Sequence, residues 1–244
     1  MSHESLVVPV TAALLHPENA TLAAIPAHAN PIIMEVGTSD RDTLDLELHL
    51  PELRSAFLIS FEPMLDKYSR ALSRREASSK VQERAEPLGQ HHERGLILPM
   101  AIGPTANAVG ELQTLHVSPI AGCSSLKRSN RMRGSRSNSR LPANESNRQT
   151  FSFFCRPVAE ERRVWVVPLK QALLWVGRPI AFLKVDAQGG DLEAVLSGGD
   201  LLHTRVERLA SLPAHEHTRP SALSIALAKF TPLSICTLSQ PHLT

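Results

Sequence analysis

Three carboxylates stand where apolar segments of the sequence end: Glu35, Glu62 and Asp186. Each segment has the length and composition of a buried strand. In an open α/β sheet, ligands bind at the carboxyl ends of the strands. The recurrence of an acid at this position therefore predicts one ligand site but does not identify the ligand.

The loop after the first of these segments contains Glu35, Gly37 and Ser39. A dinucleotide-binding loop has three glycines that open a helix, and of these Gly37 alone is present, which argues against a phosphate cradle. A glycine at a strand end lets the backbone approach a ligand closely. An acid beside it suits a ligand that carries a positive charge, such as the ammonium group of S-adenosylmethionine. The alternative is an ordinary turn from strand to helix.

Glu62 follows the second segment and precedes Pro63. A carboxylate offers two acceptor oxygens in one plane, so it can accept hydrogen bonds from both hydroxyls of a ribose. The alternative is an acid that caps the helix predicted after it. Consecutive parallel strands would bring Glu35 and Glu62 to the same edge of the sheet, where one nucleoside can contact both.

Apolar periodicity predicts the elements that position these side chains. The stretch at 41–50 alternates like a strand, but its place between two strands favours a helix. Short strands that alternate with helices predict an α/β fold with a mostly parallel sheet. The predicted strands are 32–37, 57–62, 96–102, 111–117, 163–168, 180–185 and 205–212, and the predicted helices are 64–75, 169–176 and 191–196.

Five short motifs occur in an order that resembles the FkbM-type methyltransferases. They are EVGTSDRD at 35–42, FEP at 61–63, SSL at 124–126, VVPL at 166–169 and FLKVDAQG at 182–189. The resemblance covers about residues 32–212. It implies a seven-stranded Rossmann-like methyltransferase sheet, S-adenosylmethionine as cofactor, and O-methylation of a hydroxyl on a sugar or another small molecule.

The resemblance also implies roles for individual residues. It assigns Glu35, Gly37, Ser39 and Glu62 to cofactor binding. The implied reaction is a displacement at the sulfonium methyl, for which the protein mainly positions the reactants. A hydroxyl acceptor needs a base, and Asp186 is the candidate. The alternative for Asp186 is the N-cap of the helix predicted after it.

Two residues depart from the family pattern. Arg41 stands where the family has the second glycine of the first loop, and Gln188 stands where it has a glutamate. Both departures bear on activity more than on fold. They keep open a second hypothesis, in which the chain retains the fold as a binding protein without turnover.

The 244-residue chain divides into a methyltransferase-like domain at 31–212 and flanking segments. Residues 1–30 are predicted to be a loosely ordered arm. Residues 127–150 contain almost no apolar side chains and are predicted to be a disordered basic insertion. Prolines interrupt the tail at 213–244, so we expect a sheet that is incomplete at its C-terminal end. These prolines are Pro213, Pro220, Pro232 and Pro241.

Composition limits the class of protein. Apolar residues make up 42% and charged residues 20%, which is typical of a soluble globular domain. The net charge of +2 does not indicate a polyanionic partner, and the basic insertion is interpreted as a solvated loop rather than a nucleic-acid contact. The three cysteines lack metal or disulfide spacing and are expected to be reduced, with no metal site, in a soluble intracellular protein. The expected partner is a small-molecule methyl acceptor.

Overall fold

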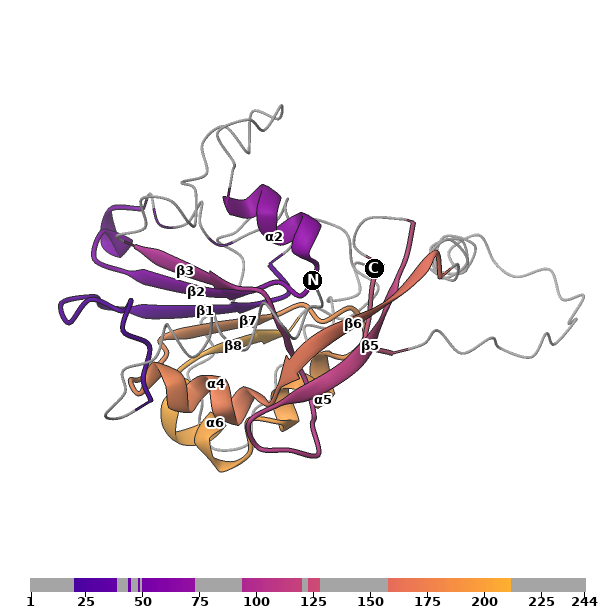
Figure 1. Ribbon diagram of the computed structural model, residues 1–244. Coiled ribbons are helices and arrows are strands. Elements are labelled where there is room, and N and C mark those ends of the chain that lie inside the picture. The colour runs from indigo at the N-terminus through magenta and orange to yellow at the C-terminus, as the bar shows by residue number, and fades with distance from the viewer. Residues whose placement is uncertain are drawn as a thin grey trace, which may run out of the picture.

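Figure 1 shows the computed structural model, which contains a five-stranded sheet flanked by helices and a three-stranded sheet beside it. No helix in the described part of the chain is long and apolar enough to cross a bilayer. The structure describes residues 20–38, 44, 48, 50–72, 94–119, 123–127 and 158–211.

The larger sheet is entirely parallel and has the order β3-β2-β1-β7-β8. The prediction of an α/β fold with a mostly parallel sheet is therefore confirmed. The chain builds outward from β1 through β2 to β3 and then returns to the other side of β1. This reversal places a topological switch point between β1 and β7. The strands are β1 (Ile32–Val36), β2 (Phe57–Phe61), β3 (Gly95–Leu98), β7 (Phe182–Val185) and β8 (Leu209–Ser211).

Helices cover both faces of this sheet (Figure 1). One face, lined by Met34, Val36 and Leu183 among others, packs against three helices. The opposite face, which includes Ile33 and Leu58, packs against Tyr68 and Leu72 of a single amphipathic helix. The helices of the first face are α4 (Leu169–Val176), α5 (Asp191–Leu196) and α6 (Asp200–Arg205), and the single helix is α2 (Leu65–Leu72).

The smaller sheet corrects the sequence prediction of one strand at 96–102. That apolar run divides into β3 and β4 (Ala101–Ile102), which belong to different sheets. Pro99 lies at the division, and the Met100 N–H donates to the Leu98 carbonyl oxygen at 2.9 Å, so the backbone bends there. Proline has no N–H for a sheet ladder, which explains why pairing stops.

The other two strands of the smaller sheet are β5 (Glu111–Val117) and β6 (Glu160–Val167). They pair antiparallel, and β4 pairs parallel to β6. The strands predicted at 111–117 and 163–168 therefore exist, but they lie outside the parallel sheet. A short 3-10 turn, Pro51–Leu53, precedes β2. The helix α6 was not predicted.

Residues 20–30 differ from the loosely ordered arm expected there. Leu22 is buried, and its N–H donates to the Trp175 carbonyl oxygen at 2.7 Å. Ala29 is also buried, and Arg178 donates to its carbonyl oxygen. This segment is part of the packed domain. The expectations for residues 1–19, for 128–150 of the basic insertion and for the tail at 213–244 lie outside the described residues.

Cys123 is disulfide-bonded, with a partner outside the described residues. The expectation that all three cysteines are reduced is therefore wrong for Cys123. The spacing of three widely separated cysteines gave no signal for a pair, because a disulfide depends on proximity in the fold rather than along the chain.

The disulfide predicts the number of reactive thiols. The chain has three cysteines, and one intrachain disulfide uses two of them, so one free thiol should remain. We expect a thiol-reactive dye to label one cysteine per chain in denaturant without reductant, and three after reduction. Labelling of three thiols before reduction of freshly purified protein would show that the bond is absent.

Candidate functional site

The three acids singled out in the sequence lie at one edge of the larger sheet. In the ladder, Glu35 of β1 is opposite Ser60 of β2 and Lys184 of β7. Glu62 and Asp186 directly follow β2 and β7, which flank β1 on either side. The prediction that parallel strands bring Glu35 and Glu62 to the same edge is confirmed.

Glu35 is completely buried and has its positive partner within the protein. Its Oε1 atom accepts a hydrogen bond from Lys184 Nζ at 2.8 Å, in an ion pair whose lysine side chain is 11% exposed. Its Oε2 atom accepts from the Leu44 N–H at 3.2 Å. The carboxylate therefore joins β1 to β7 and holds the chain that follows the first loop. Lys184 therefore places a positive charge beside this buried carboxylate. Sequence reasoning missed Lys184, although it lies two residues before Asp186.

Gly37 is required by a close approach between two strand ends. Its φ is +76°, in the left-handed region. A Cβ at this position would lie 1.9 Å from the carbonyl oxygen of Asp186. The Asp186 N–H also donates to the Val36 carbonyl oxygen at 2.9 Å, so the β1–β7 ladder continues into the loop. The missing side chain of Gly37 therefore makes room for the backbone of Asp186.

Two hydroxyl groups near this edge are buried without a hydrogen-bond partner in the described part of the chain. Thr38 follows Gly37, and Ser60 lies opposite Glu35 in β2. Both residues are 0% exposed. A buried hydroxyl without a partner is costly, and such groups in native structures usually bind water or a ligand.

Glu62 is also buried, with 3% of its surface exposed. Its Oε1 atom accepts a hydrogen bond from the Met64 N–H at 2.9 Å, just before α2 begins. The alternative prediction, that Glu62 caps the helix after it, is therefore supported for the Oε1 atom. This bond also fixes the orientation in which the carboxylate meets the edge of the sheet.

Asp186 is half-buried, and its Oδ1 atom accepts a hydrogen bond from Gln188 Nε2 at 2.7 Å. It is not the N-cap of α5, because Gly190 occupies that position. The carboxylate of Asp191 instead organises the turn, accepting from the N–H groups of Ala187 at 2.9 Å and Gly189 at 3.0 Å. Asp191 was not singled out in the sequence, although an acid directly after two glycines at a helix start is a detectable signal.

Gln188 has an uncommon backbone conformation. Its φ is +50° and that of Gly189 is +87°, while the Gly190 N–H donates to the Ala187 carbonyl oxygen at 3.1 Å. Two central residues with positive φ and this hydrogen bond define a type I′ turn. A non-glycine residue in the left-handed region is strained, and such strain persists where surrounding contacts hold it. The bond from Gln188 to Asp186 is one of these contacts.

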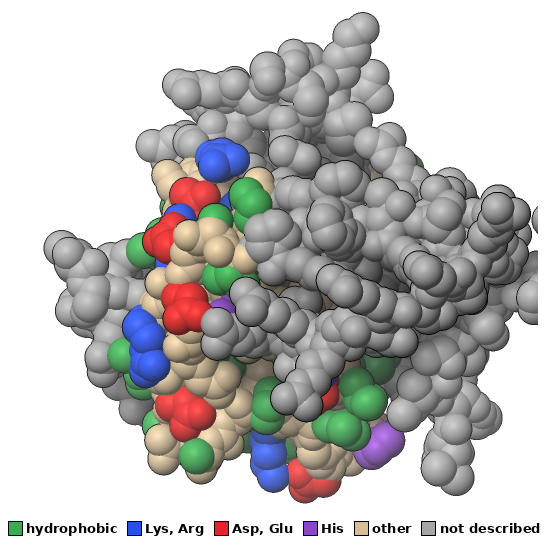
Figure 2. Space-filling view, turned by 90° about the vertical axis from the view of Figure 1, so that its right-hand side faces the viewer, with side chains coloured by type: hydrophobic (Ala, Val, Ile, Leu, Met, Phe, Trp, Pro, Cys, Tyr) green, Lys and Arg blue, Asp and Glu red, His purple; other side chains and the backbone are tan. Residues whose placement is uncertain are grey.

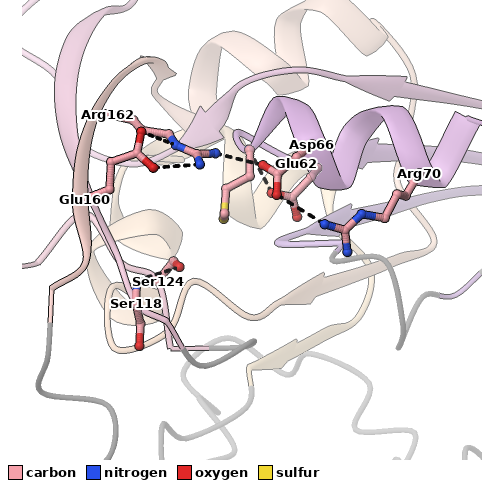
Figure 3. A network of polar contacts seen from close by, with 8 residues as sticks. Glu62, Asp66, Arg70, Ser118, Ser124, Glu160 and Arg162 are labelled. Carbon is pink, nitrogen blue, oxygen red and sulfur yellow. Dashed lines mark hydrogen bonds and ion pairs between the residues drawn. The ribbon is translucent and has the colours of Figure 1, made fainter.

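An ion-pair network connects the smaller sheet to α2 (Figure 3). Arg162 of β6 donates to both oxygens of Glu160, at 2.9 and 2.8 Å, and to Asp66 Oδ1 at 2.8 Å. Arg70 lies 3.5 Å from the other oxygen of Asp66. The hydrogen bond from Arg162 lowers the pKa of Glu160. Burial acts to raise the pKa of Asp66, but the hydrogen bond from Arg162 and the charges of Arg162 and Arg70 leave it below its usual value.

The charges on the face shown in Figure 2 are mixed. Acidic and basic side chains of the described residues alternate over this face and do not gather by sign. Lys127, the first residue of the basic insertion, pairs with Glu193 of α5 at 2.5 Å. The hydrogen bond from Lys127 lowers the pKa of Glu193. This ion pair attaches the start of the insertion to the helix that follows the Asp186 turn.

Ser39 and Arg41 of the first loop, and the pair His91-His92, lie outside the described residues. Within the described ranges, no group of three or more histidine, cysteine or acidic side chains could hold a metal ion. Models of known protein families, curated proteins and solved structures were compared with the chain, and none matches it. The site is therefore interpreted from its own geometry.

Proposed function

We propose that this chain is an S-adenosylmethionine-dependent methyltransferase that methylates a hydroxyl group of a sugar or another small molecule. The observation that carries the proposal is the order of the parallel sheet. In chain order its strands run 3-2-1-4-5, an order typical of doubly wound nucleotide-binding sheets. In such sheets the ligand binds where the order reverses, which here is the edge that bears Glu35, Glu62 and Asp186.

The residues at this edge fit the proposed cofactor. Glu62 provides a carboxylate for the ribose hydroxyls, as its position after β2 predicts. The Thr38 hydroxyl, buried without a partner in the described part of the chain, would be satisfied by a polar group of a bound ligand. Glu35 and Gly37 would contribute indirectly, because they hold the loop against β7. Ser39, in the same loop of the sequence, stays a proposed cofactor-binding residue.

Asp186 is the proposed base. When bound, the cofactor supplies an electrophilic methyl group on a sulfonium. Asp186 would accept the proton of the acceptor hydroxyl, so that the oxygen becomes a better nucleophile. The hydrogen bond from Gln188 holds the carboxylate in one orientation. Positioning of this kind accounts for much of the catalysis in a displacement without a covalent intermediate.

A second candidate is a binding protein that keeps the fold without turnover. Two observations favour it: Glu35 forms a buried ion pair with Lys184, and Gln188 replaces an acid in the turn beside Asp186. Under this hypothesis the chain binds the cofactor and does not transfer its methyl group. Binding and turnover therefore have to be measured separately.

Calorimetric titration with S-adenosylmethionine, together with transfer of a labelled methyl group to a panel of sugars and small hydroxyl compounds, tests the proposal. Glu62→Gln keeps an oxygen for the Met64 N–H but removes the charge, so we expect roughly tenfold weaker binding. Asp186→Asn should bind within a few-fold of wild type and lose turnover by about 100-fold or more.

Asp200→Asn is the matched control. Asp200 is an exposed acid of α6 that pairs with Lys170, so its replacement should leave both binding and turnover unchanged. Absence of cofactor binding by the folded wild-type protein at millimolar ligand would refute the proposal. Binding without turnover on any acceptor would favour the second candidate.

A further inference from the structure

The turn that carries Glu62 is fixed by the smaller sheet as well as by its own strand. Met64 is 6% exposed and belongs to an apolar cluster formed mainly by β4, β5 and β6. Two residues later, Asp66 in the first turn of α2 pairs with Arg162 of β6. The segment from Glu62 to Asp66 is thus attached to the smaller sheet by one apolar and one ionic contact.

These contacts lead directly to the Glu62 carboxylate. The Met64 N–H donates to Glu62 Oε1 at 2.9 Å, so the position of the Met64 backbone sets the orientation of the carboxylate. Asp66 is in turn held by the guanidinium of Arg162, which both oxygens of Glu160 keep in place (Figure 3). A fork held on two sides is more rigid than an isolated surface ion pair.

We propose that Arg162 is a positioning residue for the Glu62 carboxylate, acting through Asp66 and the first turn of α2. The inference rests on the proposed function for its effect on ligand binding. Its mechanical part, the control of the turn between β2 and α2, does not depend on any ligand. The smaller sheet is then a support for one wall of the nucleoside site.

Hydrogen exchange of the Met64 amide tests the mechanical part. Arg162→Met should increase the exchange rate of this amide several-fold, because the first turn of α2 loses its anchor. Arg163→Met is the matched control: Arg163 is adjacent on β6, has the same charge, and donates to the Leu112 carbonyl oxygen within the smaller sheet. Equal Met64 exchange rates in wild type and Arg162→Met would overturn the inference.

Binding of S-adenosylhomocysteine and of its 2′-deoxy analogue tests the effect on the site. If Glu62 contacts the ribose, the wild type should prefer the ligand with both hydroxyls, and Arg162→Met should reduce this preference about fivefold. A general loosening of the fold would weaken the binding of both ligands equally and leave the preference unchanged. Asp66→Asn should have the same effect as Arg162→Met, and the double variant should add nothing further.

The outcomes separate the two proposals. If the wild type binds neither ligand, the proposed function fails, and the exchange of the Met64 amide still decides the role of Arg162. If the wild type shows the preference and Arg162→Met keeps it in full, the inference about Arg162 fails while the proposed function stands. Equal effects of Arg162→Met and Arg163→Met would likewise contradict it.

Discussion

Replacement of Gly37 by alanine is expected to destabilise the fold by about 2–4 kcal/mol, because the new methyl group meets a backbone atom that cannot move aside. A Cβ at this position would lie 1.9 Å from the carbonyl oxygen of Asp186, and the φ of +76° is itself unfavourable for alanine. Relief of the clash requires β1 and β7 to separate at the edge where the site lies. Urea unfolding followed by far-ultraviolet circular dichroism measures the change.

Gly199→Ala separates the steric clash from the conformational cost of a positive φ. Gly199 also has a positive φ, +54°, but the nearest atom to an added Cβ is a side-chain carbon of Lys170 at 3.9 Å. This variant should therefore show the conformational cost alone, about 1–2 kcal/mol. If Gly37→Ala were no more destabilising than Gly199→Ala, the close approach of the two strand ends would be disproved.

Replacement of Lys184 by methionine is expected to lower the free energy of unfolding by about 3–5 kcal/mol at neutral pH, since it removes a cation that contacts the buried Glu35 carboxylate. Glu35 is 0% exposed and lies 2.8 Å from Lys184 Nζ. The loss of stability should shrink as the pH falls, because protonation of Glu35 removes the buried negative charge. Urea unfolding between neutral and mildly acidic pH measures both effects.

Two further variants control this prediction. Lys170→Met removes a lysine whose partner, Asp200, is exposed, and it should cost less than about 1 kcal/mol. The double replacement Glu35→Met with Lys184→Met removes both charges together and should recover much of the loss. A cost for Lys184→Met as small as that for Lys170→Met would mean that the Glu35–Lys184 pair is not buried.

Local patterns in the sequence were sufficient for elements bounded by clear signals. The helix predicted at 191–196 has the bounds of α5, and the helix at 169–176 has those of α4. The first is preceded by two glycines and the second by a proline, and both have an apolar face. Such signals act within a few residues, so one chain segment contains all the information that is needed.

Local sequence patterns were misleading where one apolar run fits either a single strand or two strands of different sheets. The run at 96–102 has one apolar composition throughout, yet it pairs with β2 before Pro99 and with β6 after it. The short helix α6 was missed. Local periodicity does not predict the sheet to which a strand belongs. It does not predict the disulfide at Cys123 either, because both depend on partners far along the chain.

The candidate site likewise has features that local sequence patterns predict and features that depend on distant contacts. The sequence by itself determined that Glu62 and Asp186 directly follow apolar strands and that Glu35 lies near the end of another, because short apolar runs of this length predict buried strands. Only the tertiary structure decided that Glu35 pairs with Lys184, that Gly37 faces the Asp186 carbonyl, and that Arg162 holds the turn of Glu62 through Asp66. These contacts join residues up to 149 positions apart. Sheet order and register create them, and no local pattern specifies either.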